Sequence, residues 1–463
     1  MKSMRIGVAG IAGGCPRREN NSNNGREERR KGKGGNMSTR RKLTTWAGAV
    51  AALAWVIAGL PAAHAQTTTD VYASTGANLP ENRNLQNAID ASEPGDTLIL
   101  HGAFPWWDGR EDGTARITTV DAKTNLTLIA DATDGASKGG NQRAALYIAA
   151  SSNITVIGIE FLMNRQKGID IANNNTGVQT ISNCTIRLAG DPINATGVYA
   201  LSTVKVVDCR VGPVGVNGID VRNALAPNSL ILNNTVTNCP NGNGILLWST
   251  GVAMGNRVSH CSESGISGAG GIDSPNNVVV SNIVHHCGTG LQMQGRANNT
   301  KFRYNVAYSN TVGIGLSPNA GHSGYEVHHN TVYGNGTGIR IAWASAHTAN
   351  NVGYNQVAAN IVVGNDTGID FVYSQTIPSI MYSAMWNNTT DYANQADTAT
   401  KTGVVSADPG FHSTDPANKR FLQLGPATPA AVLTTGDDSL WGGAAYMGAI
   451  EPYFPAGTVL SIR

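Results

Sequence analysis

The stretch that decides the fold runs from Asn234 to Leu247 and reads Asn-Thr-Val-Thr-Asn-Cys-Pro-Asn-Gly-Asn-Gly-Ile-Leu-Leu. Its pattern is an asparagine, a cysteine or asparagine five residues later, and then a Gly-Ile or Gly-Leu pair; further copies start at Asn256, Asn282, Asn305, Asn330 and Asn360. Looser copies start at Cys184 and Cys209, so that successive copies are 25, 25, 22, 26, 23, 25 and 30 residues apart. Repetition at a period of about 20 to 50 residues indicates a solenoid, a propeller or an array.

Each repeat contains short aliphatic runs, such as Leu230-Ile-Leu and Val278-Val-Val, and holds no stretch long enough for an amphipathic helix. A propeller blade needs about 40 residues, and a leucine-rich repeat needs a leucine scaffold, whereas valine and isoleucine dominate here. A coil of two or three short strands fits the period, because Asn and Gly at its corners accept left-handed backbone angles. Stacking would bring equivalent asparagines to about 4.8 Å from one another, where they form hydrogen-bonded ladders.

The composition agrees with this interpretation. The chain has 463 residues and 55 glycines, with 41% hydrophobic and 14% charged residues. The charge is too low and the apolar content too high for a disordered chain, and glycine lacks the three-residue period of collagen. A globular all-β chain of short segments remains.

Residues 37–65 have the features of a secretory signal peptide. Two arginines and a lysine at 40–42 precede an apolar run at 47–60, and small residues end the segment. The apolar run is shorter than the roughly 20 residues of a membrane span. We therefore expect a secreted or periplasmic protein without membrane insertion. Translation is expected to start at Met37, with residues 1–36 as a mis-called upstream extension.

Removing residues 1–65 changes the net charge. The full chain has 33 basic and 31 acidic residues, of which residues 1–65 hold 12 and 3, so the mature chain carries 21 against 28, a net charge of −7. A mildly acidic surface argues against binding to nucleic acid or to an anionic membrane.

Five cysteines follow residue 65, and all of them fall on repeat positions. Cys184 and Cys209 stand where later repeats have the first asparagine, and Cys239, Cys261 and Cys287 occupy the second ladder position. A small, weakly polar residue suits an inward corner, so we interpret them as packed free thiols. A disulfide between neighbouring coils, such as Cys239 to Cys261, is the alternative for a secreted protein.

With these repeats the chain resembles the right-handed parallel β-helix proteins of the pectate-lyase-like superfamily. Residues 82–100 resemble their N-terminal cap, and the stretches that begin at Asp408 and Met447 resemble their C-terminal tail. The resemblance implies that residues 66–400 form a single-stranded right-handed parallel β-helix with a short N-terminal cap helix, and that residues 401–463 form a tail that packs on it or caps it. Alternation along the strands predicts an interior filled by Ile245, Leu247, Ile314, Leu316, Ile339 and Ile341.

The candidate site is the strand that starts at each Gly-Ile pair, which resembles the strand lining the substrate groove in this superfamily. Alternation predicts the outward side chains, namely Asp170, Tyr199, Asp220, Arg222, Leu246, Trp248, Ser267, Gln292, Gln294, Gly315, Ser317, Arg340 and Asp370. Further candidates just beyond the strand ends are Arg296, His322, Trp343 and Tyr373. A long strip of carboxylates, guanidiniums and rings suits an extended polysaccharide.

The resemblance implies a carbohydrate-active enzyme, and we expect a polysaccharide lyase that cleaves a uronate-containing glycan by β-elimination. In that reaction a cation neutralises the substrate carboxylate and a base removes the neighbouring proton. We assign Asp220, Arg222 and Arg296 to catalysis, with Arg222 as the base and Arg296 or Lys167 as alternative bases. Asp170 and Asp220 are the expected ligands of a calcium ion. Substrate binding is assigned to Tyr199, Trp248, Gln292, Gln294, His322, Arg340 and Tyr373.

Other functions stay open, because no segment matches a lyase, hydrolase or epimerase motif in full. The alternatives are a glycoside hydrolase or uronate epimerase of this fold, and a non-catalytic glycan-binding or surface β-helix protein. Arg340 and Asp370 have the alternative of a simple surface ion pair, worth under about 1 kcal/mol. His260 and His286 share one repeat position, where a metal site or a structural histidine stack would fit.

Overall fold

The computed structural model describes residues 65–449 except for 74–82, 106–109, 112–115, 141–143, 164–165, 189–193, 223–227, 249, 299, 319–324, 343–355, 373–378, 426 and 435–446. The described residues belong to one compact unit. The predicted upstream extension, and the predicted signal peptide up to residue 64, lie outside the described residues.

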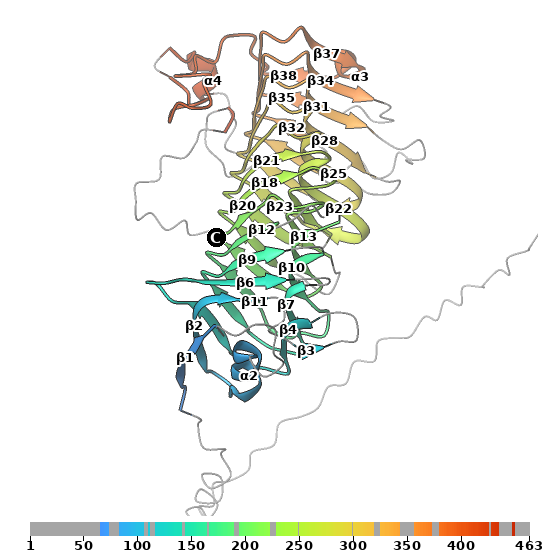
Figure 1. The fold of residues 1–463 in the computed structure, drawn as a ribbon. Helices are drawn as coiled ribbons and strands as arrows, with labels where there is room; N and C mark the ends of the chain where they lie inside the picture. Colours follow the sequence, from blue (N-terminus) through green and yellow to red (C-terminus); the bar gives the residue numbers. More distant parts are fainter. Residues whose placement is uncertain are drawn as a thin grey trace, which may run out of the picture. The chain divides into compact units, whose positions relative to one another are not determined.

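One sequence repeat forms one coil of three short strands. β17 (Ser229–Leu232) is followed by β18 (Thr235–Cys239) and β19 (Ile245–Leu247), and the next coil begins with β20 (Gly251–Met254). β20 pairs with β17 in parallel, so each coil lies directly on the one before it. Figure 1 shows the coils stacked from β2 toward β38. The stack is a right-handed parallel solenoid of about 10 turns, as the repeat pattern predicts.

The strands of successive coils form three faces, named sheets 1, 2 and 3 here. Sheet 1 contains β17 and β20 with β1 (Thr68–Tyr72), β2 (Thr97–Phe104), β5 (Thr127–Ala130), β8 (Thr155–Ile157), β11 (Gln179–Ser182), β14 (Val204–Val207), β23 (Val278–Val280), β26 (Lys301–Arg303), β29 (Glu326–His328), β32 (Gln356–Ala358), β35 (Ile380–Met381) and β38 (Lys401–Thr402). Sheet 2 contains β18 with β6 (Ala136–Gly140), β9 (Glu160–Met163), β12 (Thr185–Leu188), β15 (Arg210–Val211), β21 (Arg257–Cys261), β24 (Ile283–His285), β27 (Val306–Tyr308), β30 (Thr331–Tyr333), β33 (Ile361–Val363) and β36 (Ala384–Trp386).

Sheet 3 carries the Gly-Ile segments. It contains β19 with β4 (Arg116–Asp121), β7 (Ala144–Ala149), β10 (Lys167–Ile171), β13 (Thr196–Ala200), β16 (Ile219–Val221), β22 (Ser264–Pro275), β25 (Thr289–Asn298), β28 (Val312–Pro318), β31 (Thr337–Ala342), β34 (Thr367–Val372) and β37 (Thr390–Asn394). β3 (Arg110–Glu111) pairs with β4 antiparallel at its edge. Sheets 1 and 2 are joined because β2 is long enough to pair with β5 and, at its end, with β6.

Aliphatic side chains fill the interior of the coils. All six core residues predicted from alternation are fully buried, which confirms that prediction: Ile245, Leu247, Ile314, Leu316, Ile339 and Ile341. The glycine of each Gly-Ile pair in sheet 3 is required by packing. A Cβ on Gly244 would lie 2.3 Å from Val258 Cγ1 and 2.6 Å from the carbonyl oxygen of Gly265, so no larger residue fits between the coils.

Buried asparagines form the predicted ladder at the corner between sheets 1 and 2. The side chain of Asn282 donates to Asn305 Oδ1 at 2.9 Å, and that of Asn305 donates to Asn330 Oδ1 at 3.0 Å. The residue before each rung adopts a left-handed backbone, with φ of 55° at Ser281 and at Tyr304. The ladder therefore satisfies corner carbonyl and N–H groups that would otherwise be buried without partners.

The five described cysteines are free and buried, as predicted. The alternative of a disulfide between Cys239 and Cys261 is not formed, although their strands place them side by side in register. The backbone N–H of Cys209 donates to Asn234 Oδ1 at 2.9 Å, and that of Cys184 donates to Cys209 Sγ at 3.4 Å. The thiols therefore continue the asparagine ladder into the earlier coils.

Short helices and the tail complete the described part of the chain. α2 (Asn84–Ala91) buries Leu85 and Ile89 at the first coils, as the cap helix was predicted to do, while α3 (Gln395–Thr398) and α4 (Ala430–Thr434) follow the last coils. None of these helices is long and apolar enough to span a bilayer. The tail lies on sheet 2, where Phe421 packs edge-on against Tyr308 and the backbone N–H of Ala449 donates to Thr331 Oγ1.

Candidate functional site

The residues that alternate with the core positions of sheet 3 form one column across the coils, but Asp170, Asp220, Leu246 and Ser267 are buried and not exposed as predicted. The strand register pairs Asp170 with Tyr199, Tyr199 with Asp220, and Asp220 with Leu246. The column continues through Ser267, Gln292, Gly315, Arg340 and Asp370. Side chains alternate along each strand, and every Gly-Ile pair sets the same register, so residues far apart in the sequence fall on one line.

Four side chains on successive coils alternate between a cation and an aromatic ring. They are Lys167, Tyr199, Arg222 and Trp248, and we refer to them as the cation–ring strip. The ammonium of Lys167 lies 3.8 Å from the centre of the Tyr199 ring. The guanidinium carbon of Arg222 lies 5.9 Å from the centre of that ring and 5.2 Å from the Trp248 ring. Contacts of this kind contribute about 0.5–1 kcal/mol each at partly exposed sites.

A buried carboxylate holds each cation of the strip. Lys167 Nζ donates to Asp170 Oδ2 at 2.8 Å. Arg222 Nε lies 2.9 Å from Asp220 Oδ1, and the Asp220 side chain is only 1% exposed whereas that of Arg222 is 42% exposed. The acids therefore fix the cations in place while leaving them open to solvent.

A chain of hydrogen bonds that reaches into the next two coils orients Asp220. Asn217 Nδ2 donates to Asp220 Oδ2 at 2.7 Å, while Asn217 Oδ1 accepts from the backbone N–H of Asn243 at 2.9 Å. Asn243 Nδ2 in turn donates to Glu263 Oε2 at 2.8 Å. Burial raises the pKa of Asp220 above its usual value, and the hydrogen bonds from Arg222 and Asn217 oppose that rise. Burial also raises the pKa of Tyr199.

The sequence interpretation missed the two asparagines and Glu263 behind Asp220. A signal for the asparagines was present, because Asn217 and Asn243 each precede a Gly-Ile pair in adjacent repeats. No comparable pattern marks Glu263.

The other candidates lie farther along the column. Arg340 and Asp370 form an ion pair with Nε 3.6 Å from Oδ2, in which Arg340 is well exposed. Five coil steps of about 4.8 Å separate Arg340 from Asp220, which places them roughly 24 Å apart. Gln292 accepts a hydrogen bond from Ser264 Oγ, and Gln294 lies beside Ser317 in the register. These residues therefore lie at different positions along the column.

Some predicted residues cannot be placed at the site. The backbone of Arg296 belongs to β25, but its side chain lies outside the described residues, as do His322, Trp343 and Tyr373.

The expected calcium ligands do not fit one ion. Asp170 and Asp220 lie on either side of Tyr199 in the register, two coil steps or about 9.6 Å apart. Calcium ligands must lie about 2.3–2.6 Å from the ion. Each carboxylate is instead bound to a cationic side chain of its own. Asp170 and Asp220 therefore do not form one shared calcium site in this arrangement.

Comparisons with known proteins agree with the fold. The family described as the right handed beta helix region matches residues 171–324. No curated protein matches the chain. Solved structures with a similar fold include pectate lyase Pel9A, at 13% identity over 83% of this chain and 96% of that one, with a TM-score of 0.47. The A-module of the Azotobacter vinelandii mannuronan C-5 epimerase AlgE6 is 15% identical over 71% of this chain and 96% of that one, with a TM-score of 0.47.

The Dettilon tailspike protein (gp208) is a further similar structure, at 16% identity over 73% of this chain and 68% of that one, with a TM-score of 0.45. Similarities this distant carry no argument about function. The stacking, the strand register and the family match together establish the architecture. The chain is a right-handed parallel β-helix protein.

Proposed function

We propose that this protein binds an extended acidic polysaccharide along sheet 3, with the cation–ring strip at the centre of the binding surface. The observation that supports the proposal is the alternation of cations and rings on four successive coils, with each cation held by a buried acid. Aromatic rings offer apolar faces on which sugar rings stack, and Lys and Arg bind carboxylates. A uronate-containing chain presents both features repeatedly.

Arg222 is suited to recognise a carboxylate of the glycan. Asp220 engages its Nε, which leaves the terminal N–H groups of the guanidinium for a bidentate contact. The rings of Tyr199 and Trp248 lie on either side of the guanidinium and limit its movement. Arg340, about five coils away, would bind a carboxylate farther along the same chain.

We further propose that the bound glycan is cleaved by β-elimination at the strip. The reaction needs a cation at the uronate carboxylate and a base for the proton on the adjacent carbon. Burial is the largest single influence and opposes the charge of Arg222, but the hydrogen bond with Asp220 and the charges of Asp220 and Tyr199 together outweigh it and raise the pKa of the guanidinium. Arg222 therefore suits the carboxylate-binding task better than the role of base. An amine loses a proton more readily than a guanidinium, so Lys167 becomes the preferred base.

A non-catalytic glycan-binding surface is the second candidate function. The observation that favours it is that the two carboxylates beside the strip, Asp170 and Asp220, are each paired with one of its cations. A surface of rings and paired charges binds sugars without needing a free acid or base. We also propose that the protein acts outside the cytoplasm, as the signal peptide predicted at residues 37–65 requires.

The test is a screen of acidic and neutral polysaccharides with three readouts. Affinity electrophoresis measures binding, ultraviolet absorbance detects the unsaturated product of elimination, and a reducing-end assay detects any cleavage. Each is run with added calcium and with a chelator. Retardation by acidic glycans together with the absorbance supports the lyase, and retardation alone supports the binding surface. New reducing ends without the absorbance of an unsaturated product would show that the glycan is cleaved by hydrolysis and not by elimination. If none of the acidic glycans retards the protein, the proposal is wrong.

A further inference from the structure

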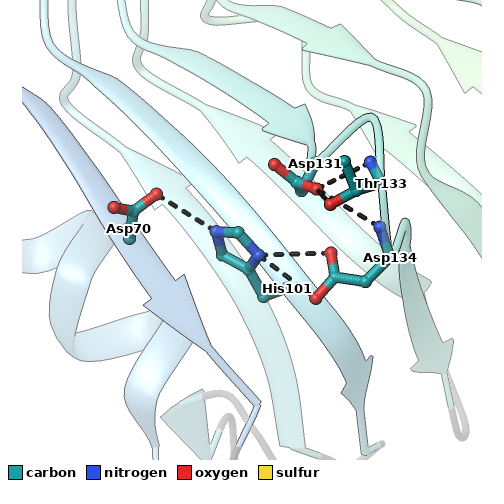
Figure 2. Close-up of polar contacts among 5 residues, drawn as sticks. All are labelled: Asp70, His101, Asp131, Thr133 and Asp134. Atoms are coloured by element: carbon teal, nitrogen blue, oxygen red, sulfur yellow. Dashed lines mark hydrogen bonds and ion pairs between the residues drawn. The ribbon is translucent and has the colours of Figure 1, made fainter.

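A second group of polar side chains lies in the first coils, away from sheet 3. His101 of β2 lies between Asp70 of β1 and Asp134 of the turn that joins β5 to β6 (Figure 2). His101 Nε2 is 3.1 Å from Asp70 Oδ1, and its Nδ1 is 3.2 and 3.3 Å from the two carboxylate oxygens of Asp134. The His101 side chain is only 11% exposed, and the ring of Tyr72 stacks on it with centres 4.4 Å apart. The imidazole is therefore held in one orientation.

A third carboxylate, that of Asp131, completes the group. One ligand atom each of His101, Asp131 and Asp134 lies within 4.8 Å of the other two. Asp131 Oδ1 accepts hydrogen bonds from the backbone N–H of Thr133 at 2.7 Å and of Asp134 at 3.2 Å (Figure 2). These bonds fix the Asp131 carboxylate in the turn and leave its second oxygen available.

Asp70 sets which nitrogen of the imidazole can act as a ligand. When Asp70 accepts the proton of Nε2, the neutral ring has its lone pair on Nδ1, which faces Asp134. A carboxylate on the far nitrogen of a histidine is the usual partner of metal-bound imidazole, because it orients the ring and makes the ligand more basic. The contacts of His101 follow that arrangement.

We propose that His101 Nδ1, Asp134 and Asp131 bind one divalent transition-metal ion such as Zn²⁺, with Asp70 as the orienting partner of the histidine. Two ligands at about 2.0–2.1 Å from a tetrahedral ion lie roughly 3.3 Å apart, close to the Nδ1–Oδ1 separation of 3.2 Å. One nitrogen and two carboxylate ligands leave a fourth position for water. Calcium fits less well, because it takes six to eight oxygen ligands.

The local charges favour a cation at this place. Among the described residues, no lysine or arginine forms an ion pair with Asp70, Asp131 or Asp134. Two of these carboxylates pair with the His101 imidazole, and the third, that of Asp131, lies close to it. A divalent ion would compensate this excess and would join β2 to the turn after β5. Through Asp70 it would also hold β1 against β2. The site would thus stabilise the first coils and would act independently of the cation–ring strip.

The proposal is tested by titrating the chelator-treated full chain with zinc chloride in a calorimeter at neutral pH. We expect one ion per chain and a higher melting temperature in its presence. His101→Gln and Asp134→Asn should each abolish this binding, and Asp70→Asn should weaken it roughly 10-fold to 100-fold. The absorption of Co²⁺ bound in place of zinc should show low coordination in the wild type and should be lost in Asp134→Asn.

Matched variants distinguish this site from the other histidines. His285→Gln alters the cluster of His260, His285 and His286, and His412→Gln alters an exposed histidine of the tail; both should keep zinc binding unchanged. Loss of binding in His285→Gln with retention in His101→Gln would overturn the proposal, as would the absence of saturable zinc binding. Should His101→Gln fail to fold by circular dichroism, Asp134→Asn, on an exposed turn, decides the outcome.

Discussion

The carboxylate of Asp220 holds the guanidinium of Arg222 from the buried side of sheet 3, with Nε 2.9 Å from Oδ1 and 3.0 Å from Oδ2. Asp220 lies in β16 and Arg222 directly follows that strand. The rings that flank the guanidinium come from the coils before and after it. Three coils therefore supply the groups around the Arg222 guanidinium, which we propose binds a carboxylate of the glycan. Because equivalent positions recur on every coil, the proposed glycan could contact sheet 3 repeatedly along its length.

Arg222→Ala should weaken binding of an acidic polysaccharide by about 10-fold to 100-fold. A hydrogen bond to a charged group contributes about 1.5–3 kcal/mol, which corresponds to that range of affinity. Affinity electrophoresis with the retained glycan measures the change. Arg187→Ala is the matched control, because Arg187 also forms an ion pair, at 2.7 Å with Glu160, but on sheet 2. If Arg222→Ala and Arg187→Ala bind the glycan with equal affinity, Arg222 is not part of the binding surface.

Trp248→Ala should weaken binding of the same glycan by roughly 2-fold to 10-fold, since ring stacking contributes about 0.5–1.5 kcal/mol. Trp248→Phe should retain much of the affinity, because it keeps an aromatic face beside Arg222. Trp386 is the control, as it is 40% exposed but lies on sheet 2. A loss of affinity in Trp386→Ala as large as that in Trp248→Ala would move the binding surface away from sheet 3.

Asn305→Ala should lower the free energy of unfolding by about 2–4 kcal/mol. Asn305 is fully buried, and the substitution removes its hydrogen bonds to the carbonyl of Val279 and to Asn330 Oδ1, together with those that it accepts from the backbone N–H and the side chain of Asn282. Urea unfolding followed by circular dichroism measures the change. Asn173→Ala, at an exposed turn, should change stability by less than about 0.5 kcal/mol. Similar losses in both variants would mean that the ladder contributes little.

The thiols of Cys239, Cys261 and Cys287 should be unreactive until the protein unfolds. All three are buried, and hydrogen bonding between the stacked thiols, together with burial, raises the pKa values of Cys261 and Cys287. A raised pKa leaves little thiolate, which is the reactive form. Titration with a thiol reagent should be slow in buffer and complete in denaturant. Rapid labelling of the native protein would contradict the buried stacking.

Acid should destabilise the protein through His285. Burial, with the charges of His286, Arg257 and His260, lowers the pKa of His285 to about 4. The unfolded chain, with a histidine pKa of about 6.5, then binds more protons than the folded chain. The stabilisation is present above pH 6.5 and is lost as the pH falls toward about 4.

The loss should be about 1–2 kcal/mol, allowing for solvent screening of a side chain that is only partly buried. Urea unfolding at several pH values measures it, and His285→Gln should flatten the dependence over this window. If the free energy of unfolding of His285→Gln depends on pH as steeply as that of the wild type, other groups cause the acid sensitivity.

The repeats alone were enough to predict the coil, its interior and the outward column of sheet 3. This is so because each Gly-Ile pair sets the register of its strand against the next, and side-chain alternation then decides which residues face outward. The column from Asp170 to Asp370 therefore could be read from spacing. The corner ladders followed for the same reason, since Asn and Gly accept the backbone angles that the corners require.

Tertiary structure decided which of these residues act together. Spacing could not show that Asp220 is buried and bound to Arg222, or that Asn217 turns its amide toward Asp220, because side-chain rotamers depend on packing between coils. His101, Asp70 and Asp134 are 31 and 33 residues apart and lie outside the Gly-Ile pattern, so only the stacking of the first coils brings them together. The sequence alone determines local backbone preference and side-chain alternation. Contacts between non-equivalent positions of different coils arise only when the coils stack.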